Sequence, residues 1–322
     1  AAWGGLDDGT LPTRYVFDEG HHLFEAADSA FSAVLSGAET AELRRWLLGA
    51  EGGRSRSRGL RRRVEDLIAE KPELEAPLDA MLQAARALAG LGWRERIAGD
   101  VEVIEGLDGG ANPTEGFLRN VRRIVLARTT EGGDRQVSWG NLECDVYPLD
   151  HAIVPSVELL TRALQRLVEP ATTFSNRLAA RLDTEAEDLD VATRTRIEAI
   201  CRSLKRRVLD PVGAWQGMLR SLVDTEREPE TLPPYTMFFQ LDRRDEAVDV
   251  DVGLHRHWLD PTIPFATTLA TPSHGMVITS ATLRDSNNDD AESAWEVAES
   301  RVGANHLPSP AVRVAVSSPF DY

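Results

Sequence analysis

The sequence has few cysteines and no long apolar segment. Its 322 residues include two cysteines, Cys144 and Cys201, which lie far apart and form no Cys-x-x-Cys pair. This spacing gives no basis for a disulfide framework, a zinc site or an iron–sulfur cluster built from this chain alone. No apolar run approaches the roughly 20 residues that span a bilayer, and the first residues lack the basic start and apolar stretch of a signal peptide. We therefore expect a cytoplasmic protein with no membrane partner.

Lysine is also scarce, because it occurs only as Lys71 and Lys205, and arginine supplies the rest of the positive charge. The formal net charge is −16. This argues against general attraction to nucleic acid or an anionic membrane, but it leaves room for a local basic surface. The length suggests about two domains. The first residue is not methionine, and residues 311–322 look like a strand that leads out of the chain, so we expect a piece of a longer protein.

Apolar periodicity predicts strands near both ends of the chain and helices between them. Residues 14–17 and 276–279 are short apolar runs that are typical of buried strands. Asp210-Pro211 should separate two helices, because proline interrupts helical hydrogen bonding. The predicted helices are 23–35, 39–48, 60–70, 74–92, 112–127 with an extended end, 154–168, 174–183, 190–208, 212–223 and 290–302.

Three further segments have β character. A small β element is expected in 124–149, around the turn Glu-Gly-Gly-Asp. After a proline-rich linker at 226–234, two strands flank the turn at 242–246 and predict a hairpin. Residues 311–317 alternate valine with other residues and predict a closing strand.

Two carboxylates directly follow the first predicted strand. Asp18 and Glu19 come after the apolar residues 15–17, and two histidines, His21 and His22, lie within the next three positions. In open α/β sheets, ligands bind at the carboxyl edge of the strands. A phosphate-transferring ATPase needs one carboxylate there to hold Mg²⁺ and a second to position the attacking water. The other interpretation is a charged turn after a strand, because short motifs give many false positives.

Small hydroxyl side chains stand at the exit of the second predicted strand. Thr279, Ser280 and Thr282 follow the apolar residues 276–278, and Ala281 lies between the last two. Such hydroxyls can hydrogen-bond a histidine or a carboxylate at the end of an adjacent strand. Taken alone, they are also typical of a cap for the following turn.

Together, the two motifs resemble those of superfamily 2 DNA helicases of the XPD/DinG type. The segment Asp18-Glu19-Gly20-His21 looks like the D-E-A-H box of these helicases, with Gly20 in place of alanine. The segment from Ser280 to Leu283 looks like their S-A-T motif, and residues 318–322 are similar to the start of their second motor domain. The long helical stretch between the motifs matches the large insertion, called the arch domain, that these helicases carry at this point.

The resemblance implies an α/β fold: a partial RecA-like P-loop NTPase motor domain, interrupted by a large, mainly helical arch insertion with a small β element. It places part of the first motor domain at 1–35, the arch at 36–230, the return to the first motor domain at 231–310 and the start of the second motor domain at 311–322. The implied protein hydrolyses ATP with Mg²⁺, moves along single-stranded DNA and separates strands. A protein partner at the arch is a further expectation.

The resemblance also implies roles for single residues. Asp18 would bind the Mg²⁺ of Mg-ATP, and Glu19 would orient and deprotonate the hydrolytic water. His21 would couple the nucleotide state to DNA movement together with the S-A-T residues Ser280, Ala281 and Thr282. His22 has no role in the motif, and we expect a solvated residue at the start of a helix.

The chain departs from the family pattern in what it lacks. It contains neither the phosphate-binding loop G-x-x-x-x-G-K-[ST] nor the arginine-finger motif. The iron–sulfur cysteines of many family members precede the D-E-A-H box, so a cluster would be held outside this chain. We therefore expect the isolated chain to be inactive.

Basic residues form two clusters in the predicted helical part. Trp46 lies close to the first cluster, and an arginine-rich segment with an aromatic nearby would suit backbone contact and base stacking on single-stranded DNA. The other interpretation is a solvated loop. The first cluster consists of Arg54, Arg56, Arg58, Arg61, Arg62 and Arg63, with the pair Arg44-Arg45 just before it. The second consists of Arg202, Lys205, Arg206 and Arg207, with the same two interpretations.

Three alternatives remain open at this point. Asp249, Asp251, His255 and His257 alternate along a predicted strand, which is compatible with a metal site or with the polar face of a hairpin. A metal-dependent hydrolase could be built on Asp18, His21 and His22. The helical middle could also be a non-enzymatic module that binds DNA or protein, in which the D-E-G-H sequence is vestigial.

Overall fold

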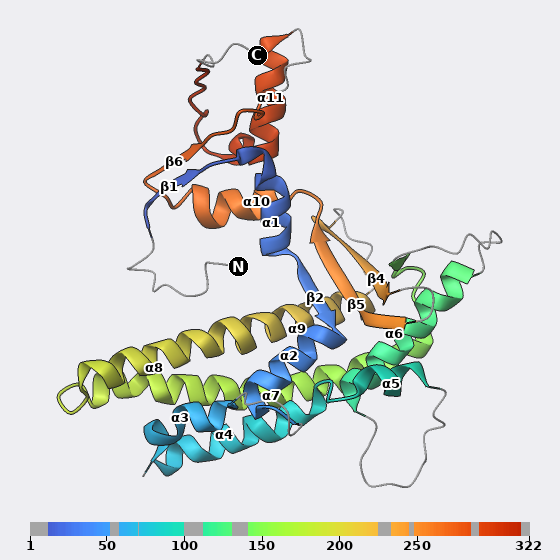
Figure 1. Cartoon of the computed structure of the whole chain (residues 1–322), viewed down its shortest axis with the longest axis vertical. Coiled ribbons are helices and arrows are strands. Elements are labelled where there is room, and N and C mark those ends of the chain that lie inside the picture. Colours follow the sequence, from blue (N-terminus) through green and yellow to red (C-terminus); the bar gives the residue numbers. More distant parts are fainter. Residues whose placement is uncertain are drawn as a thin grey trace.

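The computed structural model is a mixed α/β protein in which helices predominate (Figure 1). It describes residues 12–51, 58–69, 71–99, 112–130, 141–224, 233–244, 248–284 and 290–316. Its buried apolar residues form two separate clusters, a larger one among most of the helices and a four-stranded sheet, and a smaller one around a two-stranded sheet. Within these ranges, no helix combines the length and the apolar character needed to cross a membrane.

The smaller cluster contains the two ends of the described chain. Strand β1 (Arg14–Phe17) pairs in parallel with β6 (Gly275–Ile278), as the apolar runs predicted. Side chains alternate across this sheet, so that Tyr15, Phe17, Met276 and Ile278 face the cluster. They pack with α1 (Leu23–Phe31), α10 (Thr262–Phe265) and α11 (Ala291–Val302).

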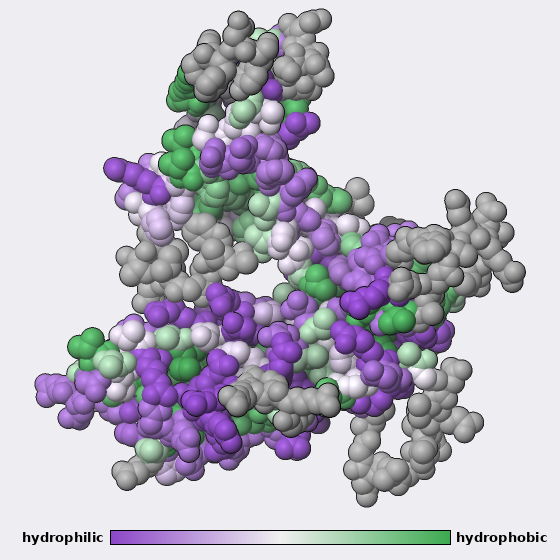
Figure 2. Space-filling view, in the orientation of Figure 1, coloured by the Kyte–Doolittle hydropathy of each residue, from purple (hydrophilic) through white to green (hydrophobic). Residues whose placement is uncertain are grey.

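The opposite face of the two-stranded sheet is open. Val16 and Val277 are 74% and 57% exposed, and Figure 2 shows hydrophobic residues on the surface near these strands. The sheet is therefore covered on one side only within the described residues.

The larger cluster holds the helical body. The antiparallel strands run in the order β2-β5-β4-β3, with bounds β2 (Ala33–Ser36), β3 (Leu142–Asp145), β4 (Tyr235–Arg244) and β5 (Val248–Trp258). The helices are α2 (Gly37–Leu48), α3 (Leu60–Ile68), α4 (Pro72–Ala84), α5 (Trp93–Ala98), α6 (Pro113–Thr130), α7 (Val154–Thr184), α8 (Val191–Leu204) and α9 (Asp210–Val223).

Three predicted helix ends are wrong. The helix predicted at 23–35 ends at Phe31, because Ala33–Ser36 pairs with β5 as strand β2. The helix predicted at 74–92 ends with α4 and one 3₁₀ turn, because the side chains of Arg44 and Asn112 take the carbonyl groups of Arg86 and Leu88.

The predicted extended end of 112–127 is also helical, since α6 continues to Thr130. The β element predicted in 124–149 is reduced to β3 within the described residues. Residues 131–140, which include the predicted turn, lie outside them.

Two pairs of predicted helices are continuous in the structure, although Asp210-Pro211 was expected to separate one of these pairs. The segments 154–168 and 174–183 form the single helix α7, which contains Pro170. An interior proline costs about 3 kcal/mol, and the buried stripe on both sides of Pro170, which includes Leu164 and Phe174, offsets it. Pro211 is the second residue of α9. A π-helical turn, Lys205–Leu209, joins α8 to α9 without a break.

The hairpin β4–β5 and the helix at 290–302 are confirmed, but the closing strand is wrong within the described residues. Residues 311–316 pair with no strand. Arg313 instead binds Glu292 and Glu299 of α11, while Val312 and Val314 stay 90% and 70% exposed. Strands β4 and β5, which follow the predicted domain boundary at residue 231, pack in the larger cluster through residues such as Phe239, whereas β6 packs in the smaller cluster.

A half-buried ion-pair network joins the start of α4 to the end of α7 and gives a pH-dependent prediction. Hydrogen bonds from Arg181, and then from Lys71, lower the pKa of Glu185 from 4.5 to about 2. A lowered pKa stabilises the fold above the ordinary carboxyl pKa, and this contribution disappears as pH falls through about 2.

Glu185→Gln should therefore lower the urea midpoint at pH 7, and the difference from the original chain should shrink steadily below pH 4.5. The exposed Glu187 is the control: Glu187→Gln should show no such difference. A difference for Glu185→Gln that is independent of pH would contradict this assignment.

Candidate functional site

The parallel pairing of β1 with β6 brings the D-E-G-H and S-A-T segments together. Phe17, the last residue of β1, lies opposite Ile278, the last residue of β6. The two chains then leave the sheet side by side: the N–H of Thr279 donates to the carbonyl of Phe17, and the N–H of Gly20 donates to the carbonyl of Thr279, each at 2.9 Å. The carboxyl ends of both strands therefore form one edge.

A side-chain hydrogen bond joins the two motifs at this edge. His21 Nδ1 lies 2.8 Å from Ser280 Oγ and 3.3 Å from a carboxylate oxygen of Glu19. The N–H of Thr282 donates to Ser280 Oγ at 3.2 Å, and the Thr282 hydroxyl lies 3.4 Å from the same oxygen. Ser280 is thus the point at which His21 and Thr282 meet, and the exposed Ala281 is the spacer between the two hydroxyl residues.

The two carboxylates of the D-E-G-H segment are exposed to solvent. Asp18 Oδ1 accepts the N–H of Glu19 at 3.0 Å. An exposed carboxylate is a suitable ligand for Mg²⁺, which keeps several of its waters and binds through one or two carboxylates. Asp18 therefore fits the metal that the motif implies. The Glu19 side chain is 63% exposed, so its carboxylate is accessible to a water molecule from solvent.

Glu19 has an unusual backbone conformation. Its φ and ψ are 52° and 47°, in the left-handed region, and it is the one non-glycine residue with positive φ among the described residues. This region costs a non-glycine residue roughly 1–2 kcal/mol. The turn directs the chain from β1 into the short 3₁₀ helix Gly20–His22, which places His21 against Ser280.

The glycine at position 20 has a steric reason in this structure. Gly20 is buried, and a Cβ atom there would lie 2.3 Å from Ile278 Cγ2. Such a contact is too short for carbon atoms, so an alanine at this position would push against the last residue of β6. The side chain of Ile278 on the facing strand therefore gives a steric reason for glycine, rather than alanine, at this position.

His22 is mostly exposed and, in the part of the chain that the structure describes, makes no hydrogen bond to Ser280 or Thr282. Its side chain is 65% exposed and lies 3.5 Å from Glu25 of α1, and its ring is 3.9 Å from the ring of His21. Among the described residues, no three His, Cys, Asp or Glu side chains gather as a metal-holding group. The structure therefore does not bring Asp18, His21 and His22 together as ligands.

The Asp and His residues of β5 make separate contacts. Asp249 binds Arg122, Asp251 accepts from Ser36, and His257 lies 2.9 Å from Asp28 of α1. His255 stacks on Phe238, and burial lowers the pKa of this histidine. These residues link β5 to its neighbours. The alternating pattern of aspartate and histidine is therefore explained by contacts that hold the hairpin in place.

The predicted DNA-contacting arginines are only partly described. Arg54 and Arg56 lie outside the described residues, and Arg58, Arg61, Arg62 and Arg63 are exposed. Trp46, expected nearby as a base-stacking residue, is 6% exposed and belongs to the larger cluster. The stacking prediction is therefore wrong for this conformation, because guanidinium groups and core residues cover the ring.

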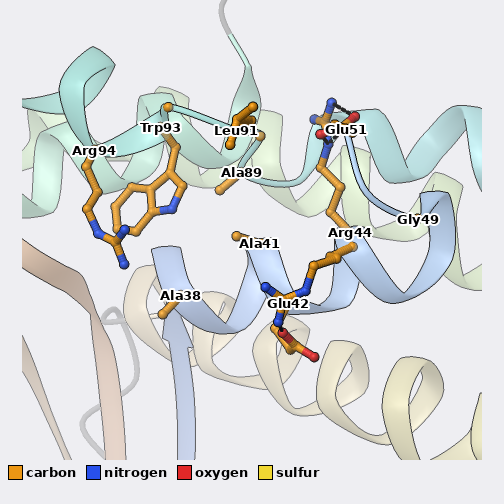
Figure 3. A pocket seen from close by; sticks show the side chains of 13 residues that line it. Ala38, Ala41, Glu42, Arg44, Gly49, Glu51, Ala89, Leu91, Trp93 and Arg94 are labelled. Atoms are coloured by element: carbon orange, nitrogen blue, oxygen red, sulfur yellow. Dashed lines mark hydrogen bonds and ion pairs between the residues drawn. The ribbon is translucent and has the colours of Figure 1, made fainter. Parts of the chain in front are cut away.

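A pocket of about 390 Å³ lies between α2, residues 89–92 and α5 (Figure 3). Its charged side chains already have partners. Arg44 binds Glu51, Arg45 pairs with Glu42, and Arg94 donates to a backbone carbonyl of β5. We assign no ligand to this pocket.

Sequence patterns missed two features of the site, the left-handed Glu19 and the contact between Gly20 and Ile278. The only signal for either was the glycine in place of alanine.

Comparison with known proteins adds no relative: no protein-family model and no curated protein matches this chain.

Proposed function

We propose that the chain is part of an ATP-dependent DNA helicase of the XPD/DinG type. It would supply the D-E-G-H and S-A-T strands of a RecA-like motor domain, with the helical body inserted between them as the arch. The complete enzyme would hydrolyse Mg-ATP and use the energy to move along single-stranded DNA and separate strands.

One observation carries this proposal: His21 and Ser280 are 259 positions apart and lie 2.8 Å from each other at the carboxyl edge of two parallel strands. Nucleotides bind at such edges in α/β sheets. A histidine that bridges two strand ends can respond to changes at either of them, and this is the role that the motif resemblance assigns to it.

The roles of the carboxylates follow from their exposure. Asp18 would hold Mg²⁺, which binds through few carboxylates and several waters. Glu19 would accept the proton of the attacking water. The phosphate groups would be held by a phosphate-binding loop, which these 322 residues do not contain.

The proposal is tested in a protein that carries both this chain and a phosphate-binding loop. We expect ATP hydrolysis that single-stranded DNA stimulates, and strand separation that requires this hydrolysis. The isolated chain should not hydrolyse ATP. A complete protein without DNA-stimulated hydrolysis would contradict the proposal.

A second candidate is a non-enzymatic binding module. It is favoured by the separation of the two hydrophobic clusters, because the helical body has a core that shares no residue with the core beneath β1 and β6. This candidate predicts that partner binding is unaffected by replacement of Asp18 and Glu19, in the presence or absence of ATP.

A further inference from the structure

The described residues of the two basic clusters lie next to each other in the fold. Helix α3, which carries Arg61, Arg62 and Arg63, contacts α8, which leads into the second cluster. Trp46 of α2 connects them: the guanidinium carbon of Arg63 is 5.7 Å from its ring centroid, and that of Arg207 is 5.9 Å away. The side chain of Arg196 strengthens this junction by binding Asp66 and the carbonyl of Arg63.

We call this surface the basic ridge. All of its members are exposed, and Figure 2 shows mainly hydrophilic residues over α3 and α8. The members are Arg58, Arg61, Arg62, Arg63, Lys205, Arg206 and Arg207.

The basic ridge has positive charge that its neighbours do not cancel. Within the described part of the chain, Arg62, Lys205 and Arg206 form no ion pair, whereas Arg61 pairs with Asp79. Asp66 is taken by Arg196, and Glu198 lies 3.8 Å from Arg202. Because the chain as a whole carries a net charge of −16, attraction of an anion to the ridge must be local and sensitive to salt.

The basic ridge offers no aromatic ring to a ligand. Trp46 is 6% exposed beneath Arg63 and Arg207, and neither α3, α8 nor the turn Lys205–Leu209 contains an aromatic residue. Surfaces that bind single strands gain roughly 1–3 kcal/mol for each base that stacks on an aromatic side chain. The ridge lacks this contribution, so contacts between its cationic side chains and the phosphates would supply most of its affinity.

A nucleic acid that presents phosphates and keeps its bases stacked inside fits such a surface better than an open strand. Duplex DNA carries one negative charge per roughly 1.7 Å of its axis. Arginine is also suited to phosphate, because its planar guanidinium group can donate two parallel hydrogen bonds.

We propose that the basic ridge binds the phosphate backbone of duplex DNA. In the enzyme proposed above, it would hold the duplex ahead of the point at which the strands separate. The choice of DNA as the ligand rests on that proposed function. The site itself does not depend on nucleotide, because the ridge belongs to the helical body and the D-E-G-H segment belongs to the other cluster.

The test uses the 322-residue chain, a DNA duplex and a single strand with the same number of phosphates. The chain should bind the duplex more tightly than the single strand. The double variant Arg62→Gln/Arg206→Gln should reduce the slope of log affinity against log salt by roughly 1.8, because each lost phosphate contact contributes about 0.9. The two arginines over the Trp46 ring, Arg63 and Arg207, are unchanged, so the fold should persist, and circular dichroism checks this.

The matched control removes two exposed arginines from other helices. Arg220→Gln/Arg301→Gln should leave both the affinity and the slope unchanged, since these residues lie on α9 and α11 outside the basic ridge. Equal or tighter binding of the single strand would overturn the proposal, and so would an equal loss in the control. Displacement of the duplex by polyglutamate of the same charge would identify a surface for acidic proteins instead and would also overturn it.

Failure of the ridge and failure of the helicase proposal are distinguishable. If only the ridge proposal is wrong, a complete protein still shows DNA-stimulated ATP hydrolysis while the double variant binds duplex normally. If only the helicase proposal is wrong, hydrolysis is absent and the ridge still binds duplex in a salt-dependent way.

Discussion

Replacement of Glu19 with glutamine should lower the rate of ATP hydrolysis about 10²–10⁴-fold, which is the usual contribution of a general base. The amide keeps the size of the side chain but cannot accept the proton of the attacking water. The measurement is DNA-stimulated phosphate release by a protein that includes this chain and a phosphate-binding loop. Binding of a fluorescent ATP analogue should persist, because Asp18 and the phosphate-binding loop are unchanged.

Glu25→Gln is the matched control for this variant. This substitution makes the same chemical change six positions away, at an exposed side chain that lies next to His22. It should leave hydrolysis unchanged. Equal rates for the Glu19 variant and the original protein would show that Glu19 is not the base.

Replacement of Gly20 with alanine should destabilise the smaller cluster by about 1–3 kcal/mol, the usual cost of inserting a methyl group into a packed site. The new Cβ would lie 2.3 Å from Ile278 Cγ2, so β1 and β6 would have to separate at the edge where His21 meets Ser280. The measurement is the free energy of unfolding in urea. The same change should also weaken the coupling between hydrolysis and strand separation in a complete enzyme.

Two comparisons isolate this contact. Gly275→Ala, in the same sheet, places a Cβ in open space and should be neutral or slightly stabilising. In an Ile278→Ala background the offending methyl group is gone, so Gly20→Ala should cost less, with a coupling energy of roughly 0.5–3 kcal/mol. If Gly20→Ala behaves like Gly275→Ala, the steric account of the glycine is wrong.

Local patterns were sufficient for the elements that carry the site. The apolar runs at 14–17 and 276–279 predicted strands because both are short, rich in apolar residues and followed directly by polar ones. The stripe Val157, Leu160, Leu164 and Leu167 likewise predicted a helix and is buried in α7.

Features that depend on distant partners could not be predicted in the same way. The segment at 33–36 has helical spacing, but hydrogen bonds to β5 make it a strand. Pro211 was expected to end a helix, yet a π-helical turn keeps α8 and α9 continuous, and α7 likewise continues through Pro170.

The same limit applies to the surface of the helical body. Trp46 beside a run of arginines suggested a stacking platform, whereas its ring is covered by Arg63 and by Arg207 from the second cluster. A sequence pattern cannot reveal that these two clusters meet, because the contact depends on how α2, α3 and the turn after α8 pack together.

The account depends most directly on Ser280 as the link between the two motifs. The decisive measurement is the number of ATP molecules hydrolysed per base pair separated, compared between Ser280→Ala and Ser280→Thr in a protein with a phosphate-binding loop. The threonine variant keeps the hydroxyl that lies 2.8 Å from His21. We predict that Ser280→Ala hydrolyses ATP but separates far fewer base pairs per ATP, while Ser280→Thr remains close to the original ratio. An unchanged ratio in Ser280→Ala would contradict the claim that this contact couples the nucleotide site to DNA movement.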